Sequence, residues 1–133
     1  GEALINALRI NGYEISAGAD LSGLDLSGLD LSGVDLEGAN LMGADLSGAD
    51  LEGANLVLAN LESVNLEGAN LSYANLESSN PLYADLNGAN LYEANIHPLL
   101  RFIHDKNIDP SGWIRIHTNH KSVKEILDES IVP

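Results

Sequence analysis

Histidines are the first group of side chains in this sequence that could do chemistry. The four are His97, His104, His117 and His120. Imidazole nitrogens bind zinc, but a zinc site needs three or four ligands that converge on one point, and the spacing His117-x-x-His120 supplies only two. The chain has no cysteine, which excludes a thiolate metal site and a disulfide framework. We therefore predict no bound metal or cofactor and interpret the histidines as surface residues of a polar loop.

Carboxylates are the second group, and they recur at short intervals, as in the pair Asp45 and Asp50. Two nearby carboxyl groups can serve as general acid and general base, provided that a pocket shifts their pKa values and holds a substrate. The sequence contains no nucleophile elbow, phosphate-binding glycine loop or metalloprotease motif. Because the repeat described below places these carboxylates on an outer, convex surface, we predict that the protein is not an enzyme.

The negative charge is concentrated in the first three quarters of the chain. Residues 1–96 contain fifteen acidic side chains and one basic side chain, Arg9, whereas residues 97–133 contain five of each. A strongly acidic surface repels nucleic acid and anionic lipid and attracts basic protein surfaces. We therefore expect a protein partner, with no direct contact to nucleic acid or to a membrane. The predicted acidic surface comprises Asp20, Asp25, Asp30, Asp35, Glu37, Asp45, Asp50 and Glu52.

No segment of the sequence has the features of a membrane span or a signal peptide. The apolar runs are far shorter than the roughly 20 residues that cross a membrane, and no stretch has the charged-then-apolar layout of a leader. Because the chain begins at Gly1 and not at Met, we expect a trimmed or mature fragment. The sequence leaves the location open, with the cytoplasm as the default expectation.

A five-residue repeat must position these side chains. From Leu21 to Ile96 every fifth residue is leucine, except for Pro81 and the final isoleucine. The residue before each of these positions is Asp or Asn, and the residue before that is usually Ala. Residues 19–98 thus hold sixteen units without an insertion.

A period of five predicts a solenoid. It fits neither an α-helix nor a β-strand, so no single regular element keeps the leucines on one face, whereas short fixed periods are typical of stacked coils. If each unit forms one side of a square coil, four units make a twenty-residue turn with leucine and Ala inward. The Asp or Asn between them points outward, where its short side chain can bond nearby backbone. Coils stack at about 4.8 Å, so residues i and i+20 become neighbours and sixteen units make a rod of about 19 Å.

The runs Ala-Asp-Leu-Ser-Gly, Ala-Asn-Leu-Glu-Gly and Ala-Asn-Leu-Ser-Tyr resemble the pentapeptide-repeat family, whose unit is written A(D/N)LXX. The resemblance covers residues 19–98, and the motif recurs in register throughout this segment. It implies the family's right-handed quadrilateral β-helix, an all-β solenoid, here with about four coils. Leu24, Leu29 and Val34 replace Ala in the first coil, where we expect extra space against a cap. Pro81 lacks the N–H that an inner ladder uses, which suits a last coil.

The segment before the repeat, residues 1–18, predicts a short α-helical cap. Apolar residues at helical spacing indicate a helix over residues 2–10, which the pair Asn11-Gly12 is expected to end. Alternating residues over 13–17 then indicate a short extended segment. We interpret the whole segment as a cover for the open end of the first coil, which stacked repeats require.

The segment after the repeat, residues 99–133, predicts a second cap. We expect a helix that begins near Pro98, a short extended segment around Trp113 and another helix after a capping box at residues 122–125. We interpret it as a lid that closes the far end of the stack. The alternative is a dimer contact, since the resemblance implies that some members pair through their C-terminal ends.

The two positions after each leucine are free of the repeat's demands and are mostly Ser, Glu or Gly. The apolar exceptions, which we predict to contact another protein, are Met42, Val57, Leu58, Tyr73, Leu82, Tyr83 and Tyr92. Assigning the units in rotation to four sides spreads these residues over three sides and gathers them mainly around one corner. Such a patch usually marks a contact with another protein. The alternative is that the C-terminal segment folds back over it.

These features predict a non-enzymatic, rigid acidic rod. It would bind another protein through its side faces or its C-terminal segment, as a monomer or as a dimer formed through that segment. The alternative is a DNA-mimicking ligand of a type II topoisomerase (gyrase), which the resemblance implies. Residues 19–98 carry thirteen carboxylates, and B-DNA of the rod's length would carry roughly 11 charges. The length of about 19 Å opposes this alternative, because DNA half-sites lie roughly 34–36 Å apart.

Overall fold

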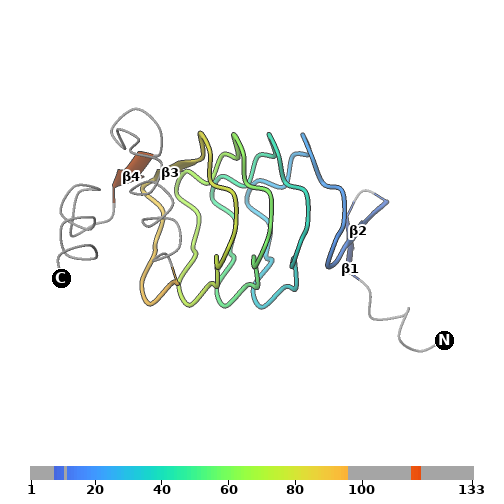
Figure 1. The fold of residues 1–133 in the computed structure, drawn as a ribbon, viewed down its shortest axis with the longest axis horizontal. Helices are drawn as coiled ribbons and strands as arrows, with labels where there is room; N and C mark the ends of the chain where they lie inside the picture. The colour runs from blue at the N-terminus through green and yellow to red at the C-terminus, as the bar shows by residue number, and fades with distance from the viewer. Residues whose placement is uncertain (1–7, 11, 96–114, 118–133) are drawn as a thin grey trace.

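The computed structural model describes residues 8–10, 12–95 and 115–117, which include four short strands (Figure 1). These are β1 (Leu8–Ile10), β2 (Tyr13–Ile15), β3 (Asp85–Asn87) and β4 (Arg115–His117). β1 pairs with β2 antiparallel, and β3 pairs with β4 parallel. Between the two pairs the chain winds into a stack of coils (Figure 1). Among the described residues, no helix is long and apolar enough to cross a membrane.

Parallel bridges join residues twenty positions apart along the whole stack. They run from the pair Asp20 and Asn40 to the pair Asn75 and Asn95, one at the Asp or Asn of every unit. Four five-residue units therefore make one coil, which is the spacing that the repeat predicts. We name the four sides by their first unit, so that side 1 begins with residues 19–23, side 2 with 24–28, side 3 with 29–33 and side 4 with 34–38.

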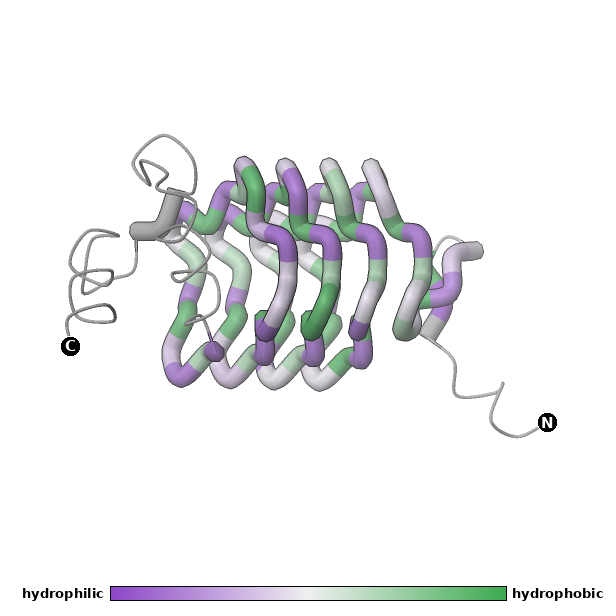
Figure 2. The backbone as a smooth tube through the Cα atoms, in the orientation of Figure 1, coloured by the Kyte–Doolittle hydropathy of each residue, from purple (hydrophilic) through white to green (hydrophobic). Residues whose placement is uncertain are grey.

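The interior is a column of leucine and alanine side chains. Every repeat leucine from Leu21 to Leu86 is at most 2% exposed, and the residue two before it is buried from Ala39 to Ala89. Figure 2 shows hydrophobic and hydrophilic segments at matching places on successive coils. Burying one leucine side chain contributes about 1.5–3 kcal/mol, so this column is the main stabilising element of the rod. The wider Leu24 in the first coil is only partly buried and lines a pocket with Ile10 of β1 and Tyr13 of β2.

Each corner is a four-residue turn that begins at the inward leucine. In one such turn the Ala39 N–H donates to the Leu36 carbonyl at 3.0 Å. The third residue of the turn has a positive φ at every described corner, which is typical of a type II turn. The Asp or Asn before the leucine accepts the N–H of the turn's second residue, as Asp35 Oδ1 does from Glu37 at 3.1 Å. The outward polar residues therefore bond the backbone of the corners, as predicted.

The described part of the N-terminal segment forms a hairpin. The helix predicted over residues 2–10 is wrong for β1, because β1 pairs with β2 in the register Ile10 to Tyr13. This register leaves two residues for the loop, and Gly12 has a φ of 83°. The Asn11-Gly12 pair favours a two-residue hairpin turn, so it connects two strands and does not end a helix. The rest of the predicted helix lies outside the described residues.

At the other end of the stack, β4 adds one more strand to side 2. Its register with β3 pairs Leu86 with Ile116, thirty residues later, where the repeat spacing would be twenty. The extended segment predicted around Trp113 overlaps this strand. The two helices predicted within residues 99–133, and the lid or dimer contact that they would form, lie outside the described residues.

Pro81 fits the fourth coil because of the direction of the ladder. It takes the inward position of a leucine on side 1 and is buried. In earlier coils the inward residue donates its N–H to the following coil, as Leu61 does to the Asn80 carbonyl at 2.8 Å. The missing N–H of Pro81 would therefore face the C-terminal end of side 1, so it removes no bond between the four coils.

Candidate protein-binding surface

The two middle residues of each turn are the mostly exposed positions of the repeat. Corner 1 consists of residues 22–23, 42–43, 62–63 and 82–83, corner 2 of 27–28, 47–48, 67–68 and 87–88, corner 3 of 32–33, 52–53, 72–73 and 92–93, and corner 4 of 37–38, 57–58 and 77–78. Each corner is formed by the last two residues of the units on the side with the same number. A side chain at one corner therefore has its nearest corner neighbours about twenty residues away in the sequence.

The apolar side chains predicted to contact a protein occupy three of these corners. Met42, Leu82 and Tyr83 lie at corner 1, Tyr73 and Tyr92 at corner 3, and Val57 and Leu58 at corner 4. Exposed fractions run from 42% for Met42 to 63% for Tyr92, whereas Val57 and Leu82 are half-buried. At corner 1, Glu62 stands between Met42 and Leu82 in the stack. The rotation of units places five of the seven at the adjacent corners 1 and 4, as the sequence indicates, and their gathering into one contact surface stays a prediction.

Several corner residues have a backbone conformation that the sequence did not reveal. Leu58, Tyr73 and Tyr83 have φ values of 61°, 61° and 62° at the turn position where most corners have Gly. A non-glycine residue in this left-handed region costs roughly 1–2 kcal/mol. Leu58 and Tyr73 are 59% and 56% exposed, so burial in the chain's own core offsets little of this cost.

Corner 3 brings together the two tyrosines and two carboxylates, which we call the corner-3 cluster: Glu52, Tyr73, Tyr92 and Glu93. The ring centroids of Tyr73 and Tyr92 are 5.7 Å apart with an interplanar angle of 88°, an edge-to-face contact. The backbone N–H of Tyr73 donates to the Tyr92 carbonyl at 2.9 Å. Desolvation by neighbouring groups, followed by the negative potential of Tyr92, Glu93 and Glu52, raises the pKa of Tyr73.

The predicted acidic surface is most exposed in the first coil. Asp20, Asp25, Asp30, Asp35, Glu37 and Glu52 are exposed, whereas Asp45 and Asp50 are half-buried. The Ser27 hydroxyl donates to Asp25 Oδ1 at 2.6 Å, and the Ser27 backbone N–H donates to the same oxygen at 3.0 Å. Matching serine bonds, the hydroxyl first and the N–H second, lower the pKa of Asp20, Asp25 and Asp30. The first coil therefore presents one Asp on each of its four sides, with Glu37 in addition on side 4.

From the third coil onward, Asn replaces Asp at most bridge positions. The Asn70 amide donates to Asp50 Oδ1 at 3.3 Å, and the Asn80 amide donates to Asn60 Oδ1 at 3.4 Å. An amide group is both donor and acceptor, so Asn can stack on Asp or on Asn without placing like charges in register. In the second coil Asp45 and Asp50 are exceptions, because they pair in register with Asp25 and Asp30.

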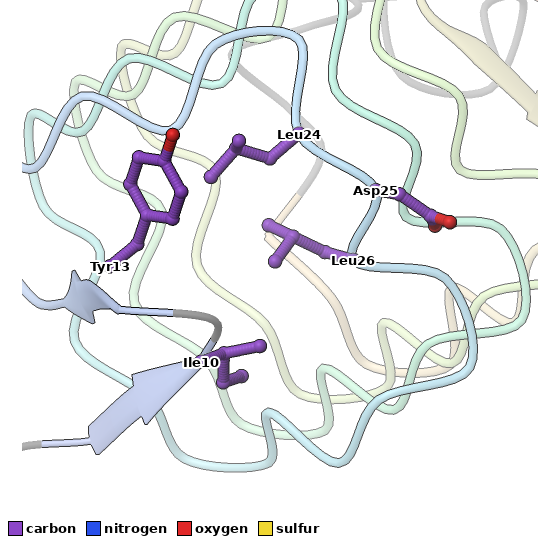
Figure 3. Close-up of a pocket in the computed structure, with 5 residues that line it drawn as sticks. All are labelled: Ile10, Tyr13, Leu24, Asp25 and Leu26. Carbon is purple, nitrogen blue, oxygen red and sulfur yellow. The ribbon is translucent and has the colours of Figure 1, made fainter.

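A small pocket beside the N-terminal hairpin was not predicted. Ile10, Tyr13, Leu24, Asp25 and Leu26 line it, and its volume is about 90 Å³ (Figure 3). Tyr13 is 47% exposed and follows directly after the hairpin loop. The sequence signal for the pocket is Leu24, which stands at a position usually occupied by Ala, where the sequence predicts extra space against a cap.

No group of three or more histidine, cysteine or carboxylate side chains within the described residues could hold a metal ion. His117 belongs to β4, and the other three histidines lie outside the described residues. The predicted loop is therefore wrong for His117, which is in a strand, and stays a prediction for the other three histidines.

Comparison with known proteins places the repeat in a family. A family model described as pentapeptide repeats matches residues 19–56, 44–80 and 69–97, in eight copies. These matches together span more than half of the chain.

Solved structures of pentapeptide repeat proteins are similar to this chain over part of their length. Rfr23 from the cyanobacterium Cyanothece 51142 is 49% identical with a TM-score of 0.58, covering 59% of this chain and 53% of that chain. HetL from Nostoc sp. strain PCC 7120, involved in heterocyst differentiation regulation, is 44% identical with a TM-score of 0.53, covering 56% and 35%. Another protein from Nostoc PCC 7120 is 40% identical with a TM-score of 0.55, covering 56% and 61%. This chain thus matches less than two thirds of each of these proteins.

Proposed function

Because the chain belongs to the pentapeptide repeat family, we propose that it is a non-enzymatic, rigid acidic module that binds another protein through its corners or its C-terminal segment. Its scaffold is then the family's right-handed quadrilateral β-helix of about four coils, which the bridges between residues twenty apart support. The pocket beside the hairpin, about 90 Å³, is smaller than the roughly 300–1,000 Å³ of ordinary ligand sites. A pocket of this size offers little room for a substrate, which favours protein binding over catalysis.

One observation carries the proposal: large side chains stand at turn positions where glycine would be more stable. Leu58 and Tyr73 have left-handed backbones and are more than half exposed. Gly38 and Gly53, one coil earlier at the same two corners, form the same turn without a side chain. Residues kept in unfavourable backbone conformations are typical of functional sites. Burial against a partner would offset a cost that the chain's own core does not.

The charge of the repeat indicates a basic partner surface. Residues 19–95 contain thirteen carboxylates and no Lys or Arg. Such a field attracts positively charged surfaces and raises the rate at which they associate. We therefore propose a partner whose contact surface is basic at its edges and apolar where it meets the corners.

Glycine substitutions at the corners test this function. The variant Leu58→Gly/Tyr73→Gly/Tyr83→Gly removes three large side chains and keeps the turns, while Ser63→Gly/Ser78→Gly changes two positions with the same backbone. Chemical cross-linking in cells followed by mass spectrometry should recover a partner with the wild type and with the serine control. The same partner should be lost with the triple variant. An identical set of partners for all three proteins would show that the corners do not bind.

A second candidate is a DNA-mimicking ligand of a type II topoisomerase (gyrase), which the exposed carboxylates of the first coil favour. The triple variant Asp20→Asn/Asp25→Asn/Asp30→Asn removes charge but keeps the turns, because Asn40 Oδ1 accepts the same N–H bond at 3.1 Å. Micromolar wild type should inhibit supercoiling by gyrase, and the variant should not. Absence of any effect of the wild type would contradict this candidate. Light scattering would show whether a dimer supplies the length that one rod lacks.

A further inference from the structure

The corner-3 cluster is the one described corner at which two aromatic rings touch. The rings of Tyr73 and Tyr92 meet edge to face at 5.7 Å and are 56% and 63% exposed, so ring faces stay open to solvent. Corner 2, by contrast, carries only Ser, Glu, Asn and Gly. The face of an aromatic ring is electronegative and attracts a guanidinium or ammonium group.

Two carboxylates flank this pair of rings. Glu52 stands at corner 3 one coil before Tyr73, and Glu93 follows Tyr92 directly. Both side chains are exposed, and residues 19–95 contain no Lys or Arg that could neutralise them. Desolvation raises the pKa of Tyr73 most, and the negative potential of Tyr92, Glu93 and Glu52 raises it further. The backbone holds Tyr73 and Glu93 at φ values of 61° and 55°, so both project from strained turn positions.

We propose that the corner-3 cluster binds an arginine side chain from a basic segment of the partner protein. The guanidinium lies on an open ring face and donates its N–H groups to Glu52 or Glu93. Arginine fits better than lysine because its planar group stacks on a ring and forks onto a carboxylate at the same time. This inference rests on the proposed function and gives the chemistry of one contact within it.

A peptide titration followed by NMR tests the site. The probe is the peptide acetyl-Gly-Arg-Gly-Arg-Gly-amide, and its control replaces each arginine by citrulline, which has the same shape without the charge. The chain has four tyrosines, so their ring signals can be followed separately. The arginine peptide should shift the signals of Tyr73 and Tyr92 along a saturating curve and leave those of Tyr13 and Tyr83 without saturation. The citrulline peptide should shift none of them.

Charge-neutral variants sharpen the assignment. Glu52→Gln or Glu93→Gln should each weaken binding of the arginine peptide about threefold, the usual size of one exposed ion pair. Glu67→Gln at corner 2 is the matched control, since Glu67 is also exposed and its substitution removes the same charge. Equal shifts at all four tyrosines would overturn the proposal, because they would indicate attraction by the whole acidic rod. Equal weakening by Glu67→Gln and Glu93→Gln would overturn it for the same reason.

Failure of this inference is distinguishable from failure of the proposed function. If the peptide does not select corner 3 but the corner glycine variant still loses its cellular partner, only the arginine contact is wrong. If the glycine variant retains every partner, the proposed function is wrong whatever the peptide does.

Discussion

The first two coils and the last two share one interior but carry different surfaces. In residues 19–58, six of eight bridge residues are Asp and seven of eight left-handed turn residues are Gly. In residues 59–95, seven of eight bridge residues are Asn and only two of seven left-handed turn residues are Gly. Eight of the thirteen carboxylates therefore lie in the half with relaxed turns, and most of the exposed large side chains lie over strained turns.

This difference indicates a division of labour along the rod. Charged groups act over about a Debye length, roughly 8 Å at physiological salt, and steer a partner before contact. Aromatic and aliphatic side chains act only in contact, where they supply most of the binding energy. A partner attracted by the first coil would thus dock on the corners of the later coils. The substitutions below test whether the two halves differ only at the surface.

Leucine truncation on side 3 should have the largest effect and should be the same in both halves. Leu51 and Leu71 are neighbours in one inward ladder and are both 0% exposed. Leu51→Ala and Leu71→Ala should each lower the free energy of unfolding by about 2–5 kcal/mol. Urea unfolding followed by circular dichroism measures both. A much smaller loss for Leu71→Ala would show that the later coils are also packed more loosely inside.

At the left-handed turn position, replacing a glycine in the first half should lower the stability, and introducing a glycine in the second half should raise it. A Cβ at Gly48 would meet nothing within 4 Å, so Gly48→Ala isolates the backbone cost and should lower stability by about 1–2 kcal/mol. Ser78, exposed with a φ of 58°, offers the reverse change. Ser78→Gly should raise stability by about 0.5–1 kcal/mol, because relief of strain exceeds the extra flexibility of the unfolded chain. Unchanged melting temperatures in both variants would remove the argument that the later corners are strained.

The repeat made the stacking of the coils predictable, but it did not predict the side-chain contacts and the strained backbones at the corners. Leucine and Asx spacing indicates a coil length that is a multiple of five, and the quadrilateral coil that the family resemblance implies then places Asp20 beside Asn40. The contact between Tyr73 and Tyr92 depends on a turn of one coil bonding the next, which no local pattern encodes. The left-handed backbone of Leu58 was hidden because the usual signal, a glycine, is absent. The hairpin was missed because Leu8 fits a helical spacing as well as a strand alternation.

Replacing Asn by Asp at one bridge position should lower the stability less than the turn substitutions do. The Asn55 amide donates to Asp35 Oδ1 at 3.2 Å, so Asn55→Asp removes a donor and puts two carboxylates in register. We expect the free energy of unfolding to fall by about 0.5 kcal/mol at low salt and by less at 1 M NaCl. Asn75→Asp is the control, because its bridge partners Asn55 and Asn95 are neutral. If both variants lose the same stability, repulsion does not explain why Asn replaces Asp in the later coils.

Removing one serine hydroxyl should have the smallest effect on stability, and the effect should be confined to the first coil. The Ser27 hydroxyl is the largest cause of the lowered pKa of Asp25, so Ser27→Ala should raise that pKa toward its ordinary value. A lowered carboxyl pKa stabilises the fold above the unfolded value of about 3.9, and this contribution is lost as pH falls through the folded pKa. The wild type should therefore lose more stability between neutral pH and acid than the variant.

Carboxyl carbon NMR from neutral pH to acid measures this shift directly, and the same spectra contain the control. Asp20 and Asp30 lie on other sides of the first coil and keep their own serine donors at 2.7 Å, so their titrations should not move. Movement of all three would mean that the first coil responds as a unit, and the serine bond would then be only one part of a wider rearrangement. A shift confined to Asp25 would show that each Ser–Asp pair tunes its own charge, which the Asn residues at most bridge positions of the later coils cannot do.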